Sequence, residues 1–124
     1  MYPESIEDGS IAFAMHAQEW MANPAGVIHG GMTSTLLDTA LTLCVIAKLP
    51  TGKMCTTTNL NVQFVRPLFP NGEKIVARGT VVHIGATTAT SEGRVYDSRN
   101  RLIAHATATL AIIDSASILR SIDA

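Results

Sequence analysis

The sequence predicts an α+β fold in which a curved antiparallel β-sheet wraps around one long, buried helix. Residues 32–48 form a strongly apolar helical segment, and four β-rich segments follow it with only short connections. Short connections favour antiparallel neighbours, and a helix that is apolar on most sides needs a covering surface that curves around it. The 124 residues fit one domain, spanning 1–124.

One strand is expected before the helix. Residues 10–16 can form it, although their alanines weaken the β preference. Asn-Pro-Ala-Gly at 23–26 is a turn, and the glycines of His29-Gly30-Gly31 interrupt any helix that would continue across them. Leucine and alanine then favour helix over 32–48, until Pro50 and Gly52 stop it.

The segments after the helix have the alternation of strands. In residues 56–65, Leu60, Val62 and Phe64 share one face, and the residues between them are polar. Turn residues at 66–72 end this strand, and further β-rich segments follow at 74–84, 87–96 and 102–113. We therefore expect about five strands, and a tail at 115–124 that has no pattern and frays.

Composition predicts a protein that associates with copies of itself. Charged residues make up only 15% of the chain, against about 25% in an ordinary soluble domain. Little charge is therefore available to cover the surface, and subunit interfaces are the simplest way to hide the rest. A homo-oligomer is the expectation.

Other features of the composition argue against several kinds of partner. The formal net charge of −1 gives no general attraction to nucleic acid or to an anionic membrane. No Cys/His spacing resembles a metal site, so we expect no metal and no cofactor. Residues 1–8 lack the apolar stretch of a signal peptide, and no apolar run reaches membrane-spanning length. Cys44 and Cys55 are expected to be reduced thiols of a cytoplasmic protein, with Cys44 buried in the helix.

Asp38 is the anomaly of the helix. It is the only formally charged residue between Glu19 and Lys48. Its neighbours at helical spacing are hydroxyl residues: Ser34, Thr35 and Thr42. Either this polar stripe faces water and Asp38 is solvated, or the carboxylate lies at a cleft, where perturbed acids concentrate at active sites.

The start of the helix is a second candidate site. A helix start has free backbone N–H groups and a positive dipole end, and the glycines Gly30 and Gly31 let a substrate carbonyl approach that backbone closely. Such donors can hold the oxyanion that forms when a carbonyl is attacked. Asp38 follows two helical turns later, roughly 10 Å further along the axis, which is too far for both groups to bind one atom but close enough for opposite ends of a reacting group and its water.

Together these residues resemble the phenylacetate-degradation (PaaI-type) branch of the hotdog-fold acyl-CoA thioesterases. The resemblance rests on Asn23, on His29-Gly30-Gly31 and on Asp38 seven residues further on. It extends through 57–67, Thr-Thr-Asn-Leu-Asn-Val-Gln-Phe-Val-Arg-Pro, and covers roughly residues 10–113. An Asp in the helix, where some relatives carry Glu, is typical of the phenylacetate branch rather than of the menaquinone or enterobactin branches.

The resemblance implies hydrolysis of an acyl-CoA that carries an aryl or a short- to medium-chain acyl group. The site would lie between two subunits of a dimer or of a dimer of dimers (a homotetramer). Asp38 would act as nucleophile or as general base on water; the sequence leaves both open. Gly30 would supply the oxyanion N–H with Gly31 as its neighbour. Asn23 would position the thioester or the water, or serve only as a turn residue. His29 would hold the loop and the Asn.

The resemblance also implies a hydroxyl early in the following strand that assists the water. Thr57 is our choice, with Thr58 close behind, but Thr56 to Thr58 allow a register error of one residue. Regular strand parity places Thr58 on the face of Leu60 and Phe64, and Thr57 on that of Asn59. Thr42 and Thr58 are further candidates for contact with the substrate.

The groups that bind the CoA phosphates are less determined. Relatives often carry Arg near the turn that Gly85-Ala86-Thr87 forms here, so Gly85 is expected close to the substrate. In the absence of Arg at this turn, the cations left as candidates are Arg66, Lys74, Arg99 and Arg101.

Three other functions fit parts of the pattern. A hotdog enoyl-CoA hydratase would need an Asp-x-Asn-Pro-x-His run, but here Met21 takes the place of the Asp and His29 comes three residues too late. A non-catalytic module that binds acyl-CoA would need the groove but not Asp38. A purely structural oligomerisation domain would leave Asp38 without a role.

Overall fold

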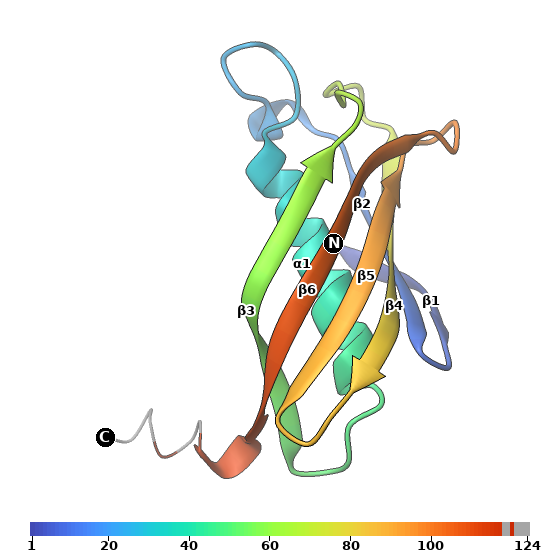
Figure 1. Cartoon of the computed structure of the whole chain (residues 1–124). Coiled ribbons are helices and arrows are strands. Elements are labelled where there is room, and N and C mark those ends of the chain that lie inside the picture. The colour runs from blue at the N-terminus through green and yellow to red at the C-terminus, as the bar shows by residue number, and fades with distance from the viewer. Residues whose placement is uncertain (118–119, 121–124) are drawn as a thin grey trace.

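The computed structural model describes residues 1–117 and 120 (Figure 1). Residues 118–119 and 121–124 lie outside this description, and with them most of the tail that we expected to fray. The described elements, in chain order, are β1 (Tyr2–Glu7), β2 (Ser10–His16), the short 3-10 helix η1 (Glu19–Met21), α1 (Gly30–Ile46), β3 (Lys53–Phe64), β4 (Lys74–Ile84), β5 (Thr88–Tyr96) and β6 (Leu102–Asp114).

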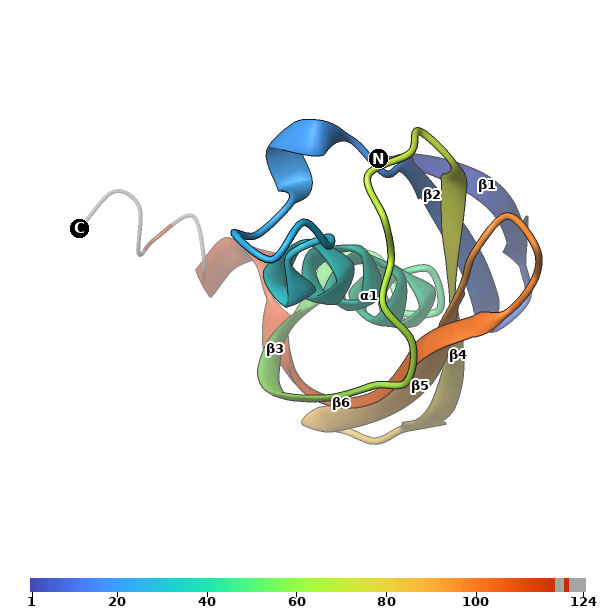
Figure 2. The ribbon, with the colours of Figure 1, turned by 90° about the horizontal axis from the view of Figure 1, so that it is seen from above.

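The strands form one antiparallel sheet in the order β1-β2-β4-β5-β6-β3. Seen from above in Figure 2, this sheet curls around α1. The expected α+β architecture is therefore confirmed, with one strand more than the five anticipated. The extra strand, β1, forms a hairpin with β2 through Gly9, whose φ is 76°. Nearly all its residues are exposed, so it lacks the burial alternation that makes a strand visible in a sequence.

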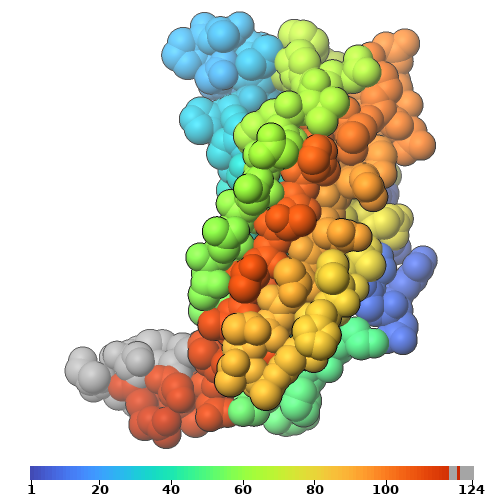
Figure 3. Space-filling view, in the orientation of Figure 1, coloured from blue at the N-terminus to red at the C-terminus, as the bar shows by residue number. Residues whose placement is uncertain are grey.

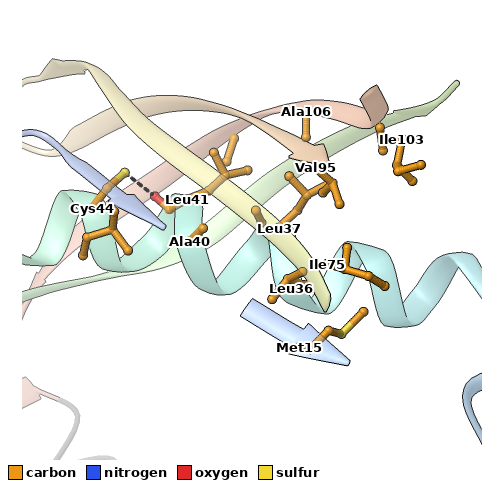
Figure 4. Close-up of a cluster of buried hydrophobic side chains, with 14 of the residues drawn as sticks. Met15, Leu36, Leu37, Ala40, Leu41, Cys44, Ile75, Val95, Ile103 and Ala106 are labelled. Carbon is orange, nitrogen blue, oxygen red and sulfur yellow. Dashed lines mark hydrogen bonds between the residues drawn. The ribbon is translucent and has the colours of Figure 1, made fainter. Parts of the chain in front are cut away.

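The helix begins at Gly30, two residues earlier than predicted, and ends at Ile46. The glycines do not delay it, because the side chain of His29 caps its first turn. On its inner side, Leu36, Leu37 and Leu41 are fully buried against the sheet (Figure 4). The helix lies so close to β4 that a Cβ at Gly79 would be 2.5 Å from the Ala40 carbonyl oxygen.

A β-bulge in β3 alters which side chains face the helix. Thr57 pairs with Leu110 and Asn59 pairs with Thr109, so Thr58 has no partner of its own. The extra residue reverses the alternation, and Thr57 shares the inner face with Leu60. The parity that we expected, with Thr57 beside Asn59, is therefore wrong, because regular alternation cannot anticipate an inserted residue.

The sheet has an outer face that points away from the helix and a free edge at β3. The outer side chains of β3, β6 and β5 cover the face seen in Figure 3. β3, with 12 residues, is the edge strand nearest the helix face that carries Asp38, and its outer edge pairs with no other described strand. Among the described residues, no helix is both long and apolar enough to cross a membrane.

Candidate active site

Three side chains from α1 and β3 form a hydrogen-bonded cluster. The Thr57 hydroxyl donates to Oδ1 of Asp38 at 2.7 Å, and Oγ1 of Thr42 lies 3.2 Å from Oγ1 of Thr57. All three residues are half-buried. The α1 spacing of four residues places Asp38 and Thr42 one turn apart on one face, and the bulge turns Thr57 toward them. Asp38 is therefore held by a hydroxyl, and no cation of residues 1–117 or 120 forms an ion pair with it.

The backbone at the start of α1 leaves one donor open. The N–H of Gly31 donates to Nδ1 of His29 at 2.8 Å, and the N–H of Met32 donates to the His29 carbonyl at 2.9 Å. Within the described part of the chain, the N–H of Gly30 makes no hydrogen bond. The first amides of a helix have no intrahelical acceptor, so this donor is available to an incoming group. The open end of the helix dipole adds partial positive charge there.

Gly30 opens onto a groove of about 390 Å³. The groove is mostly apolar, and Arg66 supplies the charged side chain among its lining residues. Its other lining residues are Val27, Ile28, Thr33, Phe64, Val65, Pro67, Leu68 and Ile103. The groove has apolar walls, a backbone donor and a cation. A largely apolar ligand with an anionic end requires this combination.

Phe64 is a groove residue to which the sequence assigned no role. Its ring lies against Gly30, where an added Cβ would be 3.0, 3.3 and 3.5 Å from three ring carbons. Phe64 is nonetheless 55% exposed. The signal that could have found it is the Phe-Val-Arg-Pro end of the strand, which belongs to the stretch that resembles the family but which nothing in the sequence connects to the helix start. A glycine at 30 keeps the donor reachable beneath this ring.

The structure places the two loop residues in supporting positions. Oδ1 of Asn23 accepts from the N–H groups of Ala25 and Val27, at 3.0 and 3.3 Å. The oxygen of Asn23 thus closes the turn before the helix, while its amide nitrogen makes no hydrogen bond within the described residues. His29 caps the helix through Nδ1, and a Cβ at Gly31 would be only 2.9 Å from that nitrogen. Gly31 is therefore part of the helix cap: its N–H is bonded to His29, and its lack of a Cβ leaves room for the His29 ring.

Two predicted substrate contacts are not brought to this cluster. Thr58 is exposed on the outer face, and its hydroxyl donates to the Thr109 carbonyl at 3.1 Å. Gly85 closes the β4–β5 turn through a bond to the Thr88 carbonyl, at the end of the sheet opposite the start of α1 (Figure 1). Neither residue lies beside Asp38 or Gly30 within one chain.

The four cations that were candidates for binding the CoA phosphates differ in their ion pairs and in their distance from the groove. Lys74 forms an ion pair with Glu4, and Arg101 forms one with Asp97 at 2.8 Å. The guanidinium of Arg66 has no carboxylate partner among the described residues, and this residue lines the groove. Arg99 lies in the exposed β5–β6 turn. Arg66 is therefore the candidate closest to the open helix start.

Comparison with known proteins identifies the family. The model of the thioesterase superfamily matches residues 25–104, which include α1, β3 and the groove. The chain therefore belongs to the thioesterase superfamily, and its architecture is the hotdog fold of that family.

The relatives are similar over most of this chain. A protein of Archaeoglobus fulgidus, provisionally named an esterase, is 31% identical over 105 residues, which are 85% of this chain and 66% of that protein. Acyl-coenzyme A thioesterase 13 of Homo sapiens is 30% identical over 101 residues, 81% of this chain and 71% of that protein. This chain thus spans about two thirds of the length of the first of these relatives.

Two solved structures share the fold with appreciable identity. A phenylacetic acid degradation-related protein of Ralstonia eutropha, provisionally named a thioesterase, has a TM-score of 0.81 and is 29% identical; the match covers 88% of this chain and 82% of that one. A protein of Bacillus halodurans, solved with CoA, has a TM-score of 0.77 and is 30% identical, covering 85% and 67%.

Proposed function

We propose that this protein is an acyl-CoA thioesterase, which hydrolyses a thioester to the free acid and CoA. The observation that carries the proposal is that the chain holds both an unoccupied helix-start N–H, at Gly30, and a hydrogen-bonded carboxylate, Asp38. Such a donor stabilises the oxyanion of an attacked carbonyl, and the carboxylate supplies the base or nucleophile. The family membership supports the same chemistry.

The reaction balances with these groups. The thioester carbonyl oxygen binds the Gly30 N–H while its carbon is attacked. In one route Asp38 removes a proton from water as the water oxygen attacks; the C–S bond of the tetrahedral intermediate then breaks, and the proton held by Asp38 passes to the CoA thiolate. In the other route the Asp38 carboxylate attacks, the C–S bond breaks to give an acyl anhydride and the CoA thiolate, which takes up a proton, and water then hydrolyses the anhydride and regenerates Asp38. Single-turnover hydrolysis in ¹⁸O-labelled water distinguishes the routes, because only the anhydride route can place label in Asp38.

The proposal requires two copies of the chain. Gly30 and Asp38 are eight residues apart, or about 12 Å along α1 at ~1.5 Å per residue, whereas reacting atoms must approach to about 3–3.5 Å. We therefore propose that the Gly30 of one protomer works with the carboxylate of its partner. The unpaired β3 edge beside the carboxylate offers the surface, since an open edge readily pairs with another strand. The low charge of the chain supports a dimer or a dimer of dimers.

The substrate is proposed from the groove. Its apolar walls suit an acyl or pantetheine chain, and Arg66 is positioned for a CoA phosphate. The Bacillus halodurans relative was solved with CoA, and the Ralstonia relative is connected with phenylacetic acid degradation. We propose an aryl or a short- to medium-chain acyl group, within the phenylacetate-degradation branch. Asn23 and His29 would hold the loop that shapes this groove.

The thiols support a reducing compartment, and we propose a cytoplasmic location. Cys44 and Cys55 are both free and buried. Burial raises the pKa of the Cys44 thiol to about 11, so that it stays protonated and donates to the Leu41 carbonyl (Figure 4). Neither cysteine is therefore expected to act as a nucleophile.

The test is thiol release from a panel of aryl, short-chain and medium-chain acyl-CoAs by wild type and Asp38→Asn. We expect turnover by wild type and a loss of at least about 10³-fold in kcat for the variant, with the fold retained, because an amide can neither attack nor accept the proton. Glu92→Gln, which changes an exposed carboxylate on the outer face, is the matched control and should keep full activity.

Other results would point to the rival functions. Tight CoA binding without turnover in wild type would indicate a non-catalytic acyl-CoA module. Hydration of an enoyl-CoA without thiol release would indicate a hydratase. Unchanged thiol release by Asp38→Asn would remove Asp38 from the mechanism.

A further inference from the structure

We propose that Thr42 is a positioning residue that fixes the direction of the hydrogen bonds at Asp38. This inference rests on the proposed function, and it concerns how the carboxylate is held. Thr42 lies one helical turn after Asp38, and its Oγ1 is 3.2 Å from Oγ1 of Thr57. Either hydroxyl could donate across that distance, and the remaining contacts decide which one does.

The proton of Thr57 is already engaged. A hydroxyl has a single proton, and an ionised carboxylate can only accept. The 2.7 Å contact to Oδ1 of Asp38 is therefore donated by Thr57, and it is the stronger bond because its acceptor is charged. Toward Thr42, the Thr57 oxygen can then offer only a lone pair. The proton in the 3.2 Å contact comes from Thr42.

Two of the three other threonines of the helix, Thr35 and Thr39, are bonded differently from Thr42. A helical threonine commonly donates to the carbonyl four residues before it. Thr35 does so to Gly31 and Thr39 does so to Thr35, both at 2.8 Å. Within the described residues Thr42 makes no such bond, and its hydroxyl is directed to β3 instead. Its proton is thus available for Thr57.

The result is a one-way chain of donors, from Thr42 to Thr57 to Asp38, that joins α1 to the bulged part of β3. Each bond polarises the next, so the hydroxyl of Thr57 becomes a better donor to the carboxylate. The chain occupies Oδ1, and within the described residues no donor is bound to Oδ2 of Asp38. Oδ2 is then the oxygen presented to water or to the thioester. Without Thr42, the Thr57 hydroxyl can rotate away and the carboxylate loses its fixed orientation.

The experiment compares Thr42→Val, which keeps the shape but removes the hydroxyl, with Thr42→Ser, which restores it. Thr39→Val is the matched control, since it removes a hydroxyl from the same helix that bonds only the helix backbone and the Met1 sulfur. We expect Thr42→Val to lower kcat about tenfold with KM unchanged, because one neutral hydrogen bond acting through another group is lost. Thr42→Ser should recover most of kcat, and Thr39→Val should match wild type.

A second readout does not depend on activity. The ¹³C signal of the Asp38 carboxyl carbon should shift in Thr42→Val and return in Thr42→Ser, while Thr39→Val leaves it in place. Wild-type kcat together with an unmoved carboxyl signal in Thr42→Val would overturn the inference. So would a Thr42→Ser variant as impaired as Thr42→Val. If wild type hydrolyses no acyl-CoA, the proposed function fails, and the carboxyl signal still decides the role of Thr42.

Discussion

Replacing Gly30 by alanine separates the role of this residue in the fold from its role in the site. The backbone at Gly30 is not in the left-handed region, so an alanine meets no conformational strain there. The added Cβ would be 3.0, 3.3 and 3.5 Å from carbons of the Phe64 ring, where unstrained carbon contacts are about 3.5–4.0 Å. The ring must therefore move by about half an ångström, and its 55% exposure leaves room for that movement.

The expected effect on stability is small. Alanine is preferred over glycine inside a helix by up to about 1 kcal/mol, and displacing an exposed ring costs a similar amount or less. We expect the free energy of unfolding of Gly30→Ala to stay within about 1 kcal/mol of wild type, as measured by urea denaturation.

The expected effect on catalysis is large. Gly30 and Phe64 both line the groove, so we expect the methyl group and the displaced ring to hinder a thioester carbonyl from reaching the Gly30 N–H. Loss of one oxyanion donor costs about 10²–10³ in kcat. We therefore expect kcat/KM for acyl-CoA hydrolysis to fall at least about 100-fold.

A second substitution serves as the control. Phe64→Leu alone leaves the N–H open and should lose far less activity than Gly30→Ala, a result that would attribute the larger loss to the methyl group. Wild-type kcat/KM in a folded Gly30→Ala protein would refute the assignment of the Gly30 N–H as the oxyanion donor.

Two further predictions concern the pH dependence of stability and the assembly. Burial opposes ionisation of Asp97, but hydrogen bonds from Arg101 and Arg99 outweigh it and lower the pKa of that carboxyl below its usual value of 3.8. The stabilisation of the fold by the ionised carboxyl is therefore complete above pH 3.8 and is lost as pH falls through the lower folded pKa. Asp97→Asn should lower the free energy of unfolding by about 2 kcal/mol at pH 7, and in urea unfolding its difference from wild type should shrink below about pH 4. A difference that stays constant with pH would contradict a role for the ionised carboxyl. Light scattering should give twice or four times the chain mass of 13.2 kDa, and a stable monomer that still hydrolyses acyl-CoA would contradict a site shared between protomers.

Much of the fold followed from periodicity. Alternation located β4 with both of its ends, and the apolar helical run located α1 to within two residues at each end. β1 was missed because it is exposed on both faces and held by backbone pairing, which leaves no hydrophobic pattern. The early start of α1 depended on a histidine cap, which is not among the usual capping side chains.

The site was predictable where a single residue was chemically out of place. Asp38 was conspicuous as a lone charge in an apolar helix, and helical spacing alone connected it to Thr42. The partnership with Thr57 could not be settled from the sequence, because the bulge of β3 falls among three consecutive threonines. Phe64 was overlooked, since its contact with Gly30 joins two elements whose approach depends on the tertiary fold.

Because of the bulge in β3, the number of residues between Cys55 and Leu60, rather than their type, decides which threonine hydroxyl is hydrogen-bonded to the Asp38 carboxylate. Between Cys55 and Leu60, both of which face inward, the chain holds an even number of residues where a regular strand would hold an odd one. Removing or adding a residue in this stretch would bring a different threonine beneath Asp38, or turn the strand's apolar half toward solvent. Sequence alignments of this segment therefore identify the hydroxyl bonded to the carboxylate correctly only if their gaps respect the bulge.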